Sequence, residues 1–270
     1  ELAAGITFAK ARERAVGRVF GERVSQILQQ PNNILAVEYL AQLRGLSPER
    51  RPQAIPLERV GNAHDGAPVQ GFASASYLRG LLLAGEWERA AEYLPDFALH
   101  LYRQVAKEGK LARMENGERA VLSALRRMSR EELAALPDLS EGIENRLLAA
   151  VREAASLPGL METIKTRRYP MTRVRRLIWS AFLGVPAGLS AARPPYIRVL
   201  GANQKGLEIL AASKKAALPL ISRASQAARL PGDGAAVWTL ECRATDLFAL
   251  SLPVPPPCGQ DCTEGFIRPE

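Results

Sequence analysis

The sequence has 270 residues, enough for one large domain or two moderate ones, and its hydrophobic content of 47% is ordinary for a globular core. This composition excludes a chain that is disordered throughout, and the sequence contains no run of eighteen apolar residues that could span a membrane. The formal net charge of +8 points to an anionic partner.

The cysteines predict a reducing environment. Three of them, Cys242, Cys258 and Cys262, are too few for a disulfide framework, which favours the cytoplasm. Cys258 and Cys262 are close in sequence, but the two histidines, His64 and His100, are remote from them. Because a closed zinc site needs four clustered ligands, we expect no metal-ligating residues.

The first elements in the chain are expected to be helices. Apolar spacing over residues 1–29 predicts a helix that is broken near Gly17 and Gly21. Pro31 ends this helix, and Asn32 or Asn33 is expected to cap the next one, over residues 34–44.

A strand and a helix follow. Residues 54–60 read as a short strand that ends at the Gly61-Asn62 turn signal. Ser74 or Ser76 is then expected to cap a helix that runs to about residue 84.

Helices dominate the remainder of the chain. Charged faces opposite apolar stripes predict helices over residues 87–94, 95–110, 117–128, 129–136, 139–155, 160–165 and 172–183. The Ser129-Arg130-Glu131-Glu132 sequence is typical of a helix cap. Two short strands over residues 196–200 and 218–221 are expected to enclose a helix over residues 204–213, and a last helix is expected over residues 238–250.

Two groups of residues are candidates for phosphate binding. Arg59, at the end of the expected strand, and Asn32, at a helix start, are placed where open α/β sheets bind ligands. Ser74 and Ser76 bring hydroxyls and backbone N–H groups to a helix start, and Arg79 lies on the same helical face as Ser76. Ordinary helix capping beside a solvated arginine would explain the same residues.

A basic run is the strongest sign of RNA binding. It carries six cations in twelve residues, namely Lys165, Arg167, Arg168, Arg173, Arg175 and Arg176. Tyr169 lies among them, and an aromatic ring can stack on an unpaired base. Arg198 and Lys205 are expected to extend this surface. The alternative is a solvated, arginine-rich helix start.

Several motifs occur together in a fixed order: residues 31–39, Arg59 with His64-Asp65, and residues 74–79, 141–146, 166–173 and 196–201. This ordered set resembles the bacterial tRNA(Met) cytidine acetate ligase family, a branch of the nucleotidyltransferase superfamily. The resemblance implies that ATP, as substrate with Mg²⁺, activates acetate to acetyl-adenylate. The acetyl group would then pass to the wobble cytidine of elongator tRNA(Met), giving N(4)-acetylcytidine.

The resemblance also implies roles for individual residues. Asn32 and Arg59 match nucleotide-binding positions, and Ser74, Ser76 and Arg79 match the phosphate-contacting serine–arginine loop. The family's His-x-Gly-His motif does not occur in this sequence. We therefore expect the catalytic residues upstream of Glu1, and we expect these 270 residues alone not to catalyse adenylation.

The expected fold is mainly α with short strands: a remnant of a Rossmann-like nucleotidyltransferase α/β domain, followed by a helical bundle and a small α/β element. The expected divisions are residues 1–94 for ATP binding, 95–185 for tRNA binding, 186–250 for the small α/β element and 251–270 for a Pro-rich flexible tail. Two other functions stay open, a non-catalytic basic helical RNA-binding module and another adenylyltransferase. The sequence does not indicate an oligomeric state.

Overall fold

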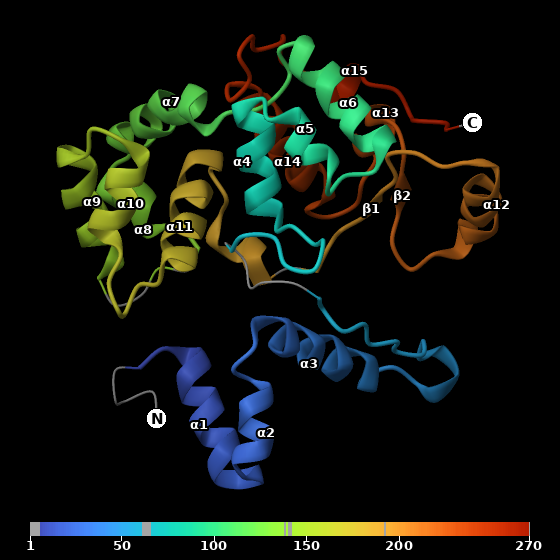
Figure 1. The fold of residues 1–270 in the computed structure, drawn as a ribbon. Helices are drawn as coiled ribbons and strands as arrows, with labels where there is room; N and C mark the ends of the chain where they lie inside the picture. Colours follow the sequence, from blue (N-terminus) through green and yellow to red (C-terminus); the bar gives the residue numbers. More distant parts are fainter. Residues whose placement is uncertain (1–5, 61–65, 138, 140–141, 192, 270) are drawn as a thin grey trace. The chain divides into compact units, whose positions relative to one another are not determined.

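The computed structural model describes residues 6–60, 66–137, 139, 142–191 and 193–269 (Figure 1). The chain divides into two compact units. Unit 1 comprises Glu1–Tyr77 with Lys165–Pro170, and unit 2 comprises Leu78–Ile164 with Met171–Glu270. The expected boundaries after residues 94 and 185 do not coincide with this division, because the later helices and the small α/β element pack into one unit.

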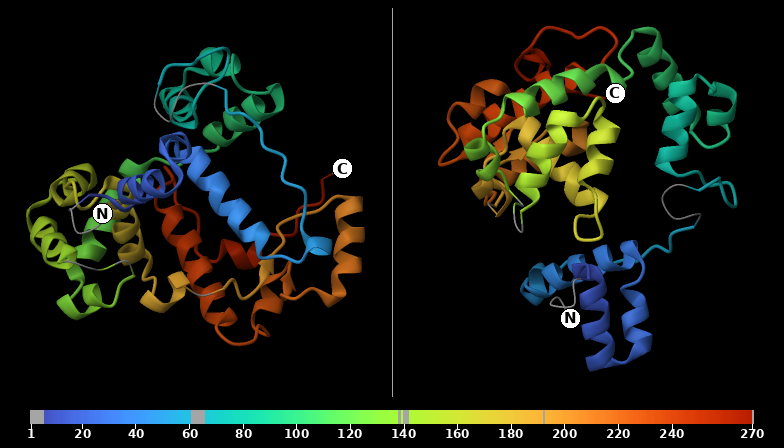
Figure 2. Two further views of the ribbon diagram at one scale, coloured as in Figure 1. Left: turned by 90° about the horizontal axis from the view of Figure 1, so that it is seen from below. Right: turned by 90° about the vertical axis from the view of Figure 1, so that its left-hand side faces the viewer.

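Unit 1 begins with a helical hairpin. Helices α1 (Phe8–Phe20) and α2 (Glu22–Ile27) lie side by side in two views (Figures 1 and 2). The predicted break at Gly21 is confirmed, since Gly21 has a φ of 84°, which favours glycine. The predicted break at Gly17 is wrong. A Cβ atom there would lie 3.4 Å from the Ser25 side chain, so Gly17 allows α1 and α2 to approach closely.

Helix α3 (Pro31–Arg44) begins earlier than the sequence suggested. Gln30 is its N-cap residue, so the prediction that Asn32 or Asn33 caps the helix is wrong. Proline is well suited to the first helical position because its φ is already helical and its missing N–H would have no partner there. No residue of α3 is buried, and Leu35 is 53% exposed.

The strand predicted over residues 54–60 does not form. After the 3₁₀ turn η2 (Pro48–Arg50), residues 51–60 are irregular and exposed, with Leu57 at 89%. A strand must pair its backbone with a neighbour, and the described part of unit 1 contains no strand that could do so. The Gly61-Asn62 turn and His64-Asp65 lie outside the described residues.

Unit 2 contains a bundle of helices with a shared apolar core. Its helices are α4 (Ala75–Ala84, whose first turn belongs to unit 1), α5 (Trp87–Ala91), α6 (Asp96–Lys107), α7 (Met114–Arg127), α8 (Arg130–Ala134), α9 (Ile143–Glu153), α10 (Leu157–Ile164) and α11 (Met171–Leu183). The largest of the almost fully buried side chains all come from α7 to α11: Val121, Leu125, Leu133, Ile143, Leu147, Leu157, Leu160, Ile164, Val174, Leu177 and Ile178. Each contributes roughly 1.5–3 kcal/mol through burial. The helical segments predicted in this region are therefore confirmed.

The small α/β element follows a 3₁₀ segment, η3 (Ala187–Ala191). Strands β1 (Ile197–Arg198) and β2 (Leu220–Ile221) are parallel, with Ile197 opposite Leu220. Helix α12 (Gln204–Ala212) and the turn η4 (Ser213–Lys215) connect them. Helices α13 (Ala224–Ala227) and α14 (Gly234–Ala249) complete the element. Both predicted strands are confirmed, although each is shorter than expected.

The C-terminal residues pack within unit 2, where the sequence suggested a flexible tail. Helix α15 (Gln260–Thr263) contacts α14, and Ile267 forms a parallel bridge with Gly201, three residues after the end of β1. Backbone hydrogen bonds supply this packing, and the sparse apolar residues of the tail did not indicate them.

The fold is thus mostly helical with a small parallel α/β element, as predicted. In the described part of the chain, every helix is too short or too polar to cross a membrane.

Candidate nucleotide and RNA sites

The structure brings Asn32 and Arg59 together. They are 27 residues apart, and the Arg59 Nη1 atom donates a hydrogen bond to Asn32 Oδ1 over 3.3 Å. Asn32 lies in the first turn of α3, while Arg59 lies in the extended segment after η2. Both side chains are exposed, so the pair is open to a ligand.

The start of α3 is electropositive. Backbone N–H groups in the first turn of a helix have no partner inside the helix, and the helix dipole adds partial positive charge there. The Gln30 side chain makes no capping hydrogen bond, and Arg59 adds a full positive charge. This arrangement is suited to a phosphate group.

Ser74 and Ser76 lie at the start of another helix. The Ser74 Oγ atom accepts a hydrogen bond from the Tyr77 N–H over 3.1 Å, so Ser74 caps α4 as one of the two predicted alternatives. Ser76 and Arg79 are exposed and lie three residues apart on α4, which places them on one face. Arg79 also borders an apolar cavity of about 520 Å³ whose lining includes Trp179 and Phe182.

The basic run contains a tight turn. The Thr166 N–H donates to the Tyr169 carbonyl over 3.1 Å, and the Tyr169 N–H donates to Thr166 Oγ1 over 3.0 Å. Tyr169 is only 7% exposed, so the prediction that it stacks on an unpaired base is wrong. Lys165, Arg167 and Arg168 are exposed around it.

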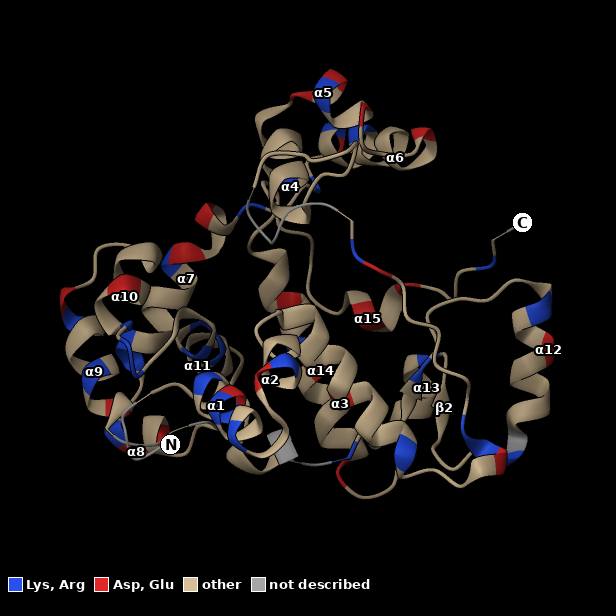
Figure 3. Ribbon diagram, turned by 60° about the horizontal axis from the view of Figure 1, so that its bottom comes forward, with Lys and Arg blue, Asp and Glu red and all other residues tan. Residues whose placement is uncertain are grey.

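Helix α11 separates its basic residues from its apolar ones. Val174 and Leu177 face the core, whereas Arg175 and Arg176 are exposed and Arg173 is half-buried. Figure 3 shows the basic positions of α11 in blue. This exposed side is available to a phosphate backbone.

Arg198 is engaged inside the protein. Its guanidinium forms ion pairs with Asp261 and with Glu241, the latter over 3.4 Å, and lies 4.7 Å from the centre of the Trp238 ring. Burial lowers the pKa of Arg198, but hydrogen bonds and charges from Asp261 and Glu241 outweigh this effect and raise it. Lys205, by contrast, is exposed in the first turn of α12.

The sequence did not indicate the acidic partners of Arg198. Glu241 and Asp261 are 43 and 63 residues from Arg198, so no local pattern connects them. The sequence also did not indicate that Arg146 donates hydrogen bonds to the last carbonyls of α10, just before Lys165. The motif over residues 141–146 was the only signal for Arg146, and its first residue lies outside the described part of the chain.

The residues near α3 do not suit a magnesium ion by themselves. Magnesium is usually held by one or two carboxylates together with substrate phosphates. Asn32 and Arg59 offer an amide oxygen and a cation, and the described residues contain no group of three or more His, Cys, Asp or Glu that could hold a metal. We therefore assign no step of the reaction to magnesium.

The mostly helical fold with a small parallel α/β element carries a cationic helix start that is suited to an anionic ligand. The chain belongs to the HIGH nucleotidyl transferase family, whose model matches residues 1–260.

Three curated relatives match between 83% and 99% of the chain. The tRNA(Met) cytidine acetate ligase of Thermoanaerobacter sp. (strain X514) is 32% identical over 99% of this chain and 66% of its own length. That of Thermoanaerobacter pseudethanolicus is 34% identical over 83% of this chain and 57% of its own length. That of Listeria monocytogenes serovar 1/2a is 33% identical over 90% of this chain and 60% of its own length. The chain thus spans between 57% and 66% of these relatives.

Solved structures give the same result. Thermotoga maritima TmcAL (apo, form I) superposes with a TM-score of 0.89 at 27% identity, over 99% of this chain and 68% of the other. The form bound with alpha-thio ATP superposes with a TM-score of 0.87 at 27% identity, over 99% and 67% of the two chains.

Proposed function

We propose that this chain is the nucleotide- and tRNA-binding portion of an ATP-dependent ligase that acetylates the wobble cytidine of elongator tRNA(Met). The pairing of Asn32 with Arg59 at the cationic start of α3 carries the proposal. Membership of the nucleotidyl transferase family and similarity to three tRNA(Met) cytidine acetate ligases support it.

The proposed reaction has two steps. An acetate oxygen attacks the α-phosphorus of ATP, forming acetyl-adenylate and releasing pyrophosphate. The exocyclic amine of cytidine then attacks the acetyl carbon, loses a proton and releases AMP. Arg59 and the N–H groups at the start of α3 hold ATP phosphates and offset their negative charge, which increases in the departing pyrophosphate.

Ser74, Ser76 and Arg79 form the second phosphate contact in this proposal. Exposed Ser76 and Arg79 on one face of α4 support this role. Residues 1–94 would belong to a Rossmann-like ATP-binding domain, and the absence of buried residues in α3 is consistent with a helix that packs on further structure.

The tRNA would contact the exposed cations of the basic run and of α11, together with Lys205. Their exposure supports the proposal, whereas the ion pairs of Arg198 favour a structural role for that residue. We place the protein in the cytoplasm, where tRNA, ATP and free thiols such as those of its three cysteines occur together.

Pyrophosphate exchange tests the catalytic part of the proposal. Because the sequence has no His-x-Gly-His motif, the 270 residues alone should give no acetate-dependent exchange between ATP and pyrophosphate. A chimaera that adds the part of the Thermoanaerobacter sp. (strain X514) ligase lying outside the 66% that this chain matches should give exchange and form N(4)-acetylcytidine, detected by mass spectrometry. Arg59→Ala in the chimaera should reduce exchange at least tenfold, while Arg50→Ala, an exposed arginine of η2, should not.

Robust exchange by the 270 residues alone would contradict the assignment of the catalytic groups. A folded chimaera that binds neither ATP nor tRNA(Met) would contradict the function itself.

A second candidate function is a non-catalytic RNA-binding module, favoured by the basic run and by the missing histidine motif. Tight, salt-sensitive binding of tRNA by the chain and a chimaera that remains inactive would support this alternative.

A further inference from the structure

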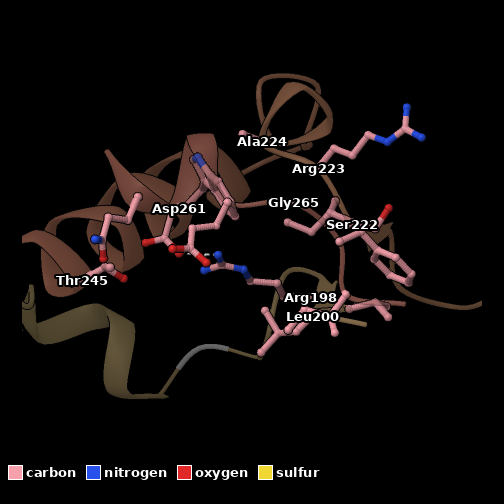
Figure 4. A pocket seen from close by; sticks show the side chains of 15 residues that line it. Arg198, Leu200, Ser222, Arg223, Ala224, Thr245, Asp261 and Gly265 are labelled. Carbon is pink, nitrogen blue, oxygen red and sulfur yellow. Dashed lines mark hydrogen bonds and ion pairs between the residues drawn. The ribbon is translucent and has the colours of Figure 1, made fainter. Parts of the chain in front are cut away.

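A second cavity lies in the small α/β element, within unit 2 and away from α3 in the chain. Its volume is about 320 Å³, and Figure 4 shows the side chains that surround it. Val199 and Leu200 follow β1 directly, and Ser222 and Arg223 follow β2 directly. The cavity therefore opens at the carboxyl ends of two parallel strands, where α/β proteins bind ligands.

The walls of this cavity are suited to a flat, apolar ligand. Trp238 and Phe266 supply aromatic rings, and Leu200, Ile221 and Ile267 supply aliphatic surface. The Arg198 guanidinium stacks on the Trp238 ring and thereby holds it in place.

One polar group in the cavity wall lacks a partner. The Asp261 side chain is only 10% exposed, and its first carboxylate oxygen is ion-paired with Arg198 (Figure 4). The second oxygen, Oδ2, is buried and has no hydrogen-bond partner among the described residues. Because Oδ2 has almost no accessible surface, a ligand in the cavity does not reach it, and the carboxylate contributes to this site through its ion pair with Arg198.

The charges around the cavity exclude a phosphate from its interior. Asp261 and Glu264 line the cavity and offset Arg198. Arg223 is exposed and points away from the other labelled side chains, toward the outside (Figure 4). A neutral ring would therefore enter the cavity, while an attached phosphate would meet Arg223 outside it.

We propose that this cavity binds an unpaired nucleobase of RNA, with the base held against the aromatic and aliphatic wall and Arg223 contacting the adjoining phosphate. The proposal rests on the proposed function in that it takes the ligand to be RNA. It adds a base-binding site that is separate from the residues assigned to ATP and from the basic run.

A glycine in the cavity wall offers a test that leaves the ion pairs intact. Gly265 lines the cavity, a Cβ atom added to it would meet no other atom within 4 Å, and its φ is not positive. Gly265→Leu should therefore add a bulky side chain at the cavity wall without strain. The matched control is Gly188→Leu in η3, which has equally open surroundings and does not line this cavity.

Affinity for a tRNA(Met) transcript is measured for the 270-residue chain and both variants at fixed salt. Gly265→Leu should weaken binding about tenfold or more, the effect of losing one stacked base, and Gly188→Leu should not. Equal affinity of Gly265→Leu and the unchanged chain would overturn the base site while leaving RNA binding intact. Failure of the unchanged chain to bind tRNA would overturn the RNA function as well.

Photo-crosslinking provides an independent readout. A transcript containing 4-thiouridine is irradiated with the protein, and the attached peptides are identified by mass spectrometry. Attachment within residues 260–267 or at Trp238, abolished in Gly265→Leu, is expected. Attachment confined to other segments would overturn the proposal.

Discussion

The ion pairs of Arg198 with Asp261 and Glu241 give this arginine a structural role, although the sequence suggested that it contacts RNA. Its side chain is 26% exposed and is held by Asp261 and Glu241. These ion pairs connect β1 with α14 and α15, so Arg198 stabilises the small α/β element. Removing Arg198 would leave the buried Asp261 carboxylate without its cation, which is strongly unfavourable.

Cys242 should be the least reactive of the three thiols. It is half-buried on α14, where burial and the nearby charge of Asp261 raise its pKa to about 11. The exposed Cys258 and Cys262 should therefore react faster with iodoacetamide at pH 8, because the thiolate is the nucleophile. Mass spectrometry of the native protein after timed alkylation measures the three rates.

The same thiol affects stability at alkaline pH. The thiol of Cys242 keeps its proton to a higher pH in the native state than in the unfolded chain. The contribution of this thiol to the free energy of unfolding is therefore complete below the ordinary thiol pKa and is lost as pH rises through about 11.

Equal alkylation rates of Cys242 and Cys258 in the native protein would contradict the burial of Cys242. Equal rates in denaturant are expected and serve as the control.

At the scale of elements, α10 is closed at both ends by side chains from other helices. Glu118 of α7 accepts the Leu157 N–H over 2.9 Å at its start. Arg146 of α9 donates to the Ile164 carbonyl over 2.9 Å at its end. These hydrogen bonds satisfy backbone groups that a helix end leaves unpaired. Arg146 thereby connects the motif over residues 141–146 with the end of α10, directly before the first residue of the basic run, Lys165.

Arg146→Leu should lower the free energy of unfolding by about 1–2 kcal/mol, because two charge-assisted hydrogen bonds to carbonyls are removed. Urea titration followed by circular dichroism measures the change. Arg152→Leu, an exposed arginine on the same helix, should change stability by less than about 0.5 kcal/mol. Equal effects of both substitutions would show that the hydrogen bonds to α10 contribute little.

At the scale of the whole molecule, the excess positive charge can bind an anionic partner only where its side chains are exposed, as on α11. The buried face of α11 is fixed by Val174, Leu177 and Ile178, so its exposed arginines can change without loss of the core. Such residues bind a polyphosphate by releasing its counterions, which makes affinity depend on salt.

Replacing Arg175 and Arg176 by alanine should weaken tRNA binding and reduce the slope of log affinity against log salt by about one for each phosphate that an arginine no longer reaches. Filter binding over a range of salt concentrations measures both. The matched control replaces Arg119 and Arg152, two exposed arginines of α7 and α9, and should leave the slope closer to that of the unchanged chain. Identical slopes for the two double variants would remove α11 from the RNA surface.

The sequence by itself determined the features that depend on neighbouring residues. Helix periodicity, the Ser129 capping box, the Ser74 cap and the break at Gly21 all follow from interactions within a few positions, and all are present. The ordered motifs likewise indicated the family, and they singled out Asn32 and Arg59 without any indication that the two side chains touch.

Only the tertiary structure decided the features that need a distant partner. Residues 54–60 have a strand-like pattern but no neighbouring strand in the described chain, Tyr169 is covered by packing, and Arg198 meets acids 43 and 63 residues away. Backbone pairing, burial and ion pairing are interactions between segments, so local sequence restricts them without fixing them.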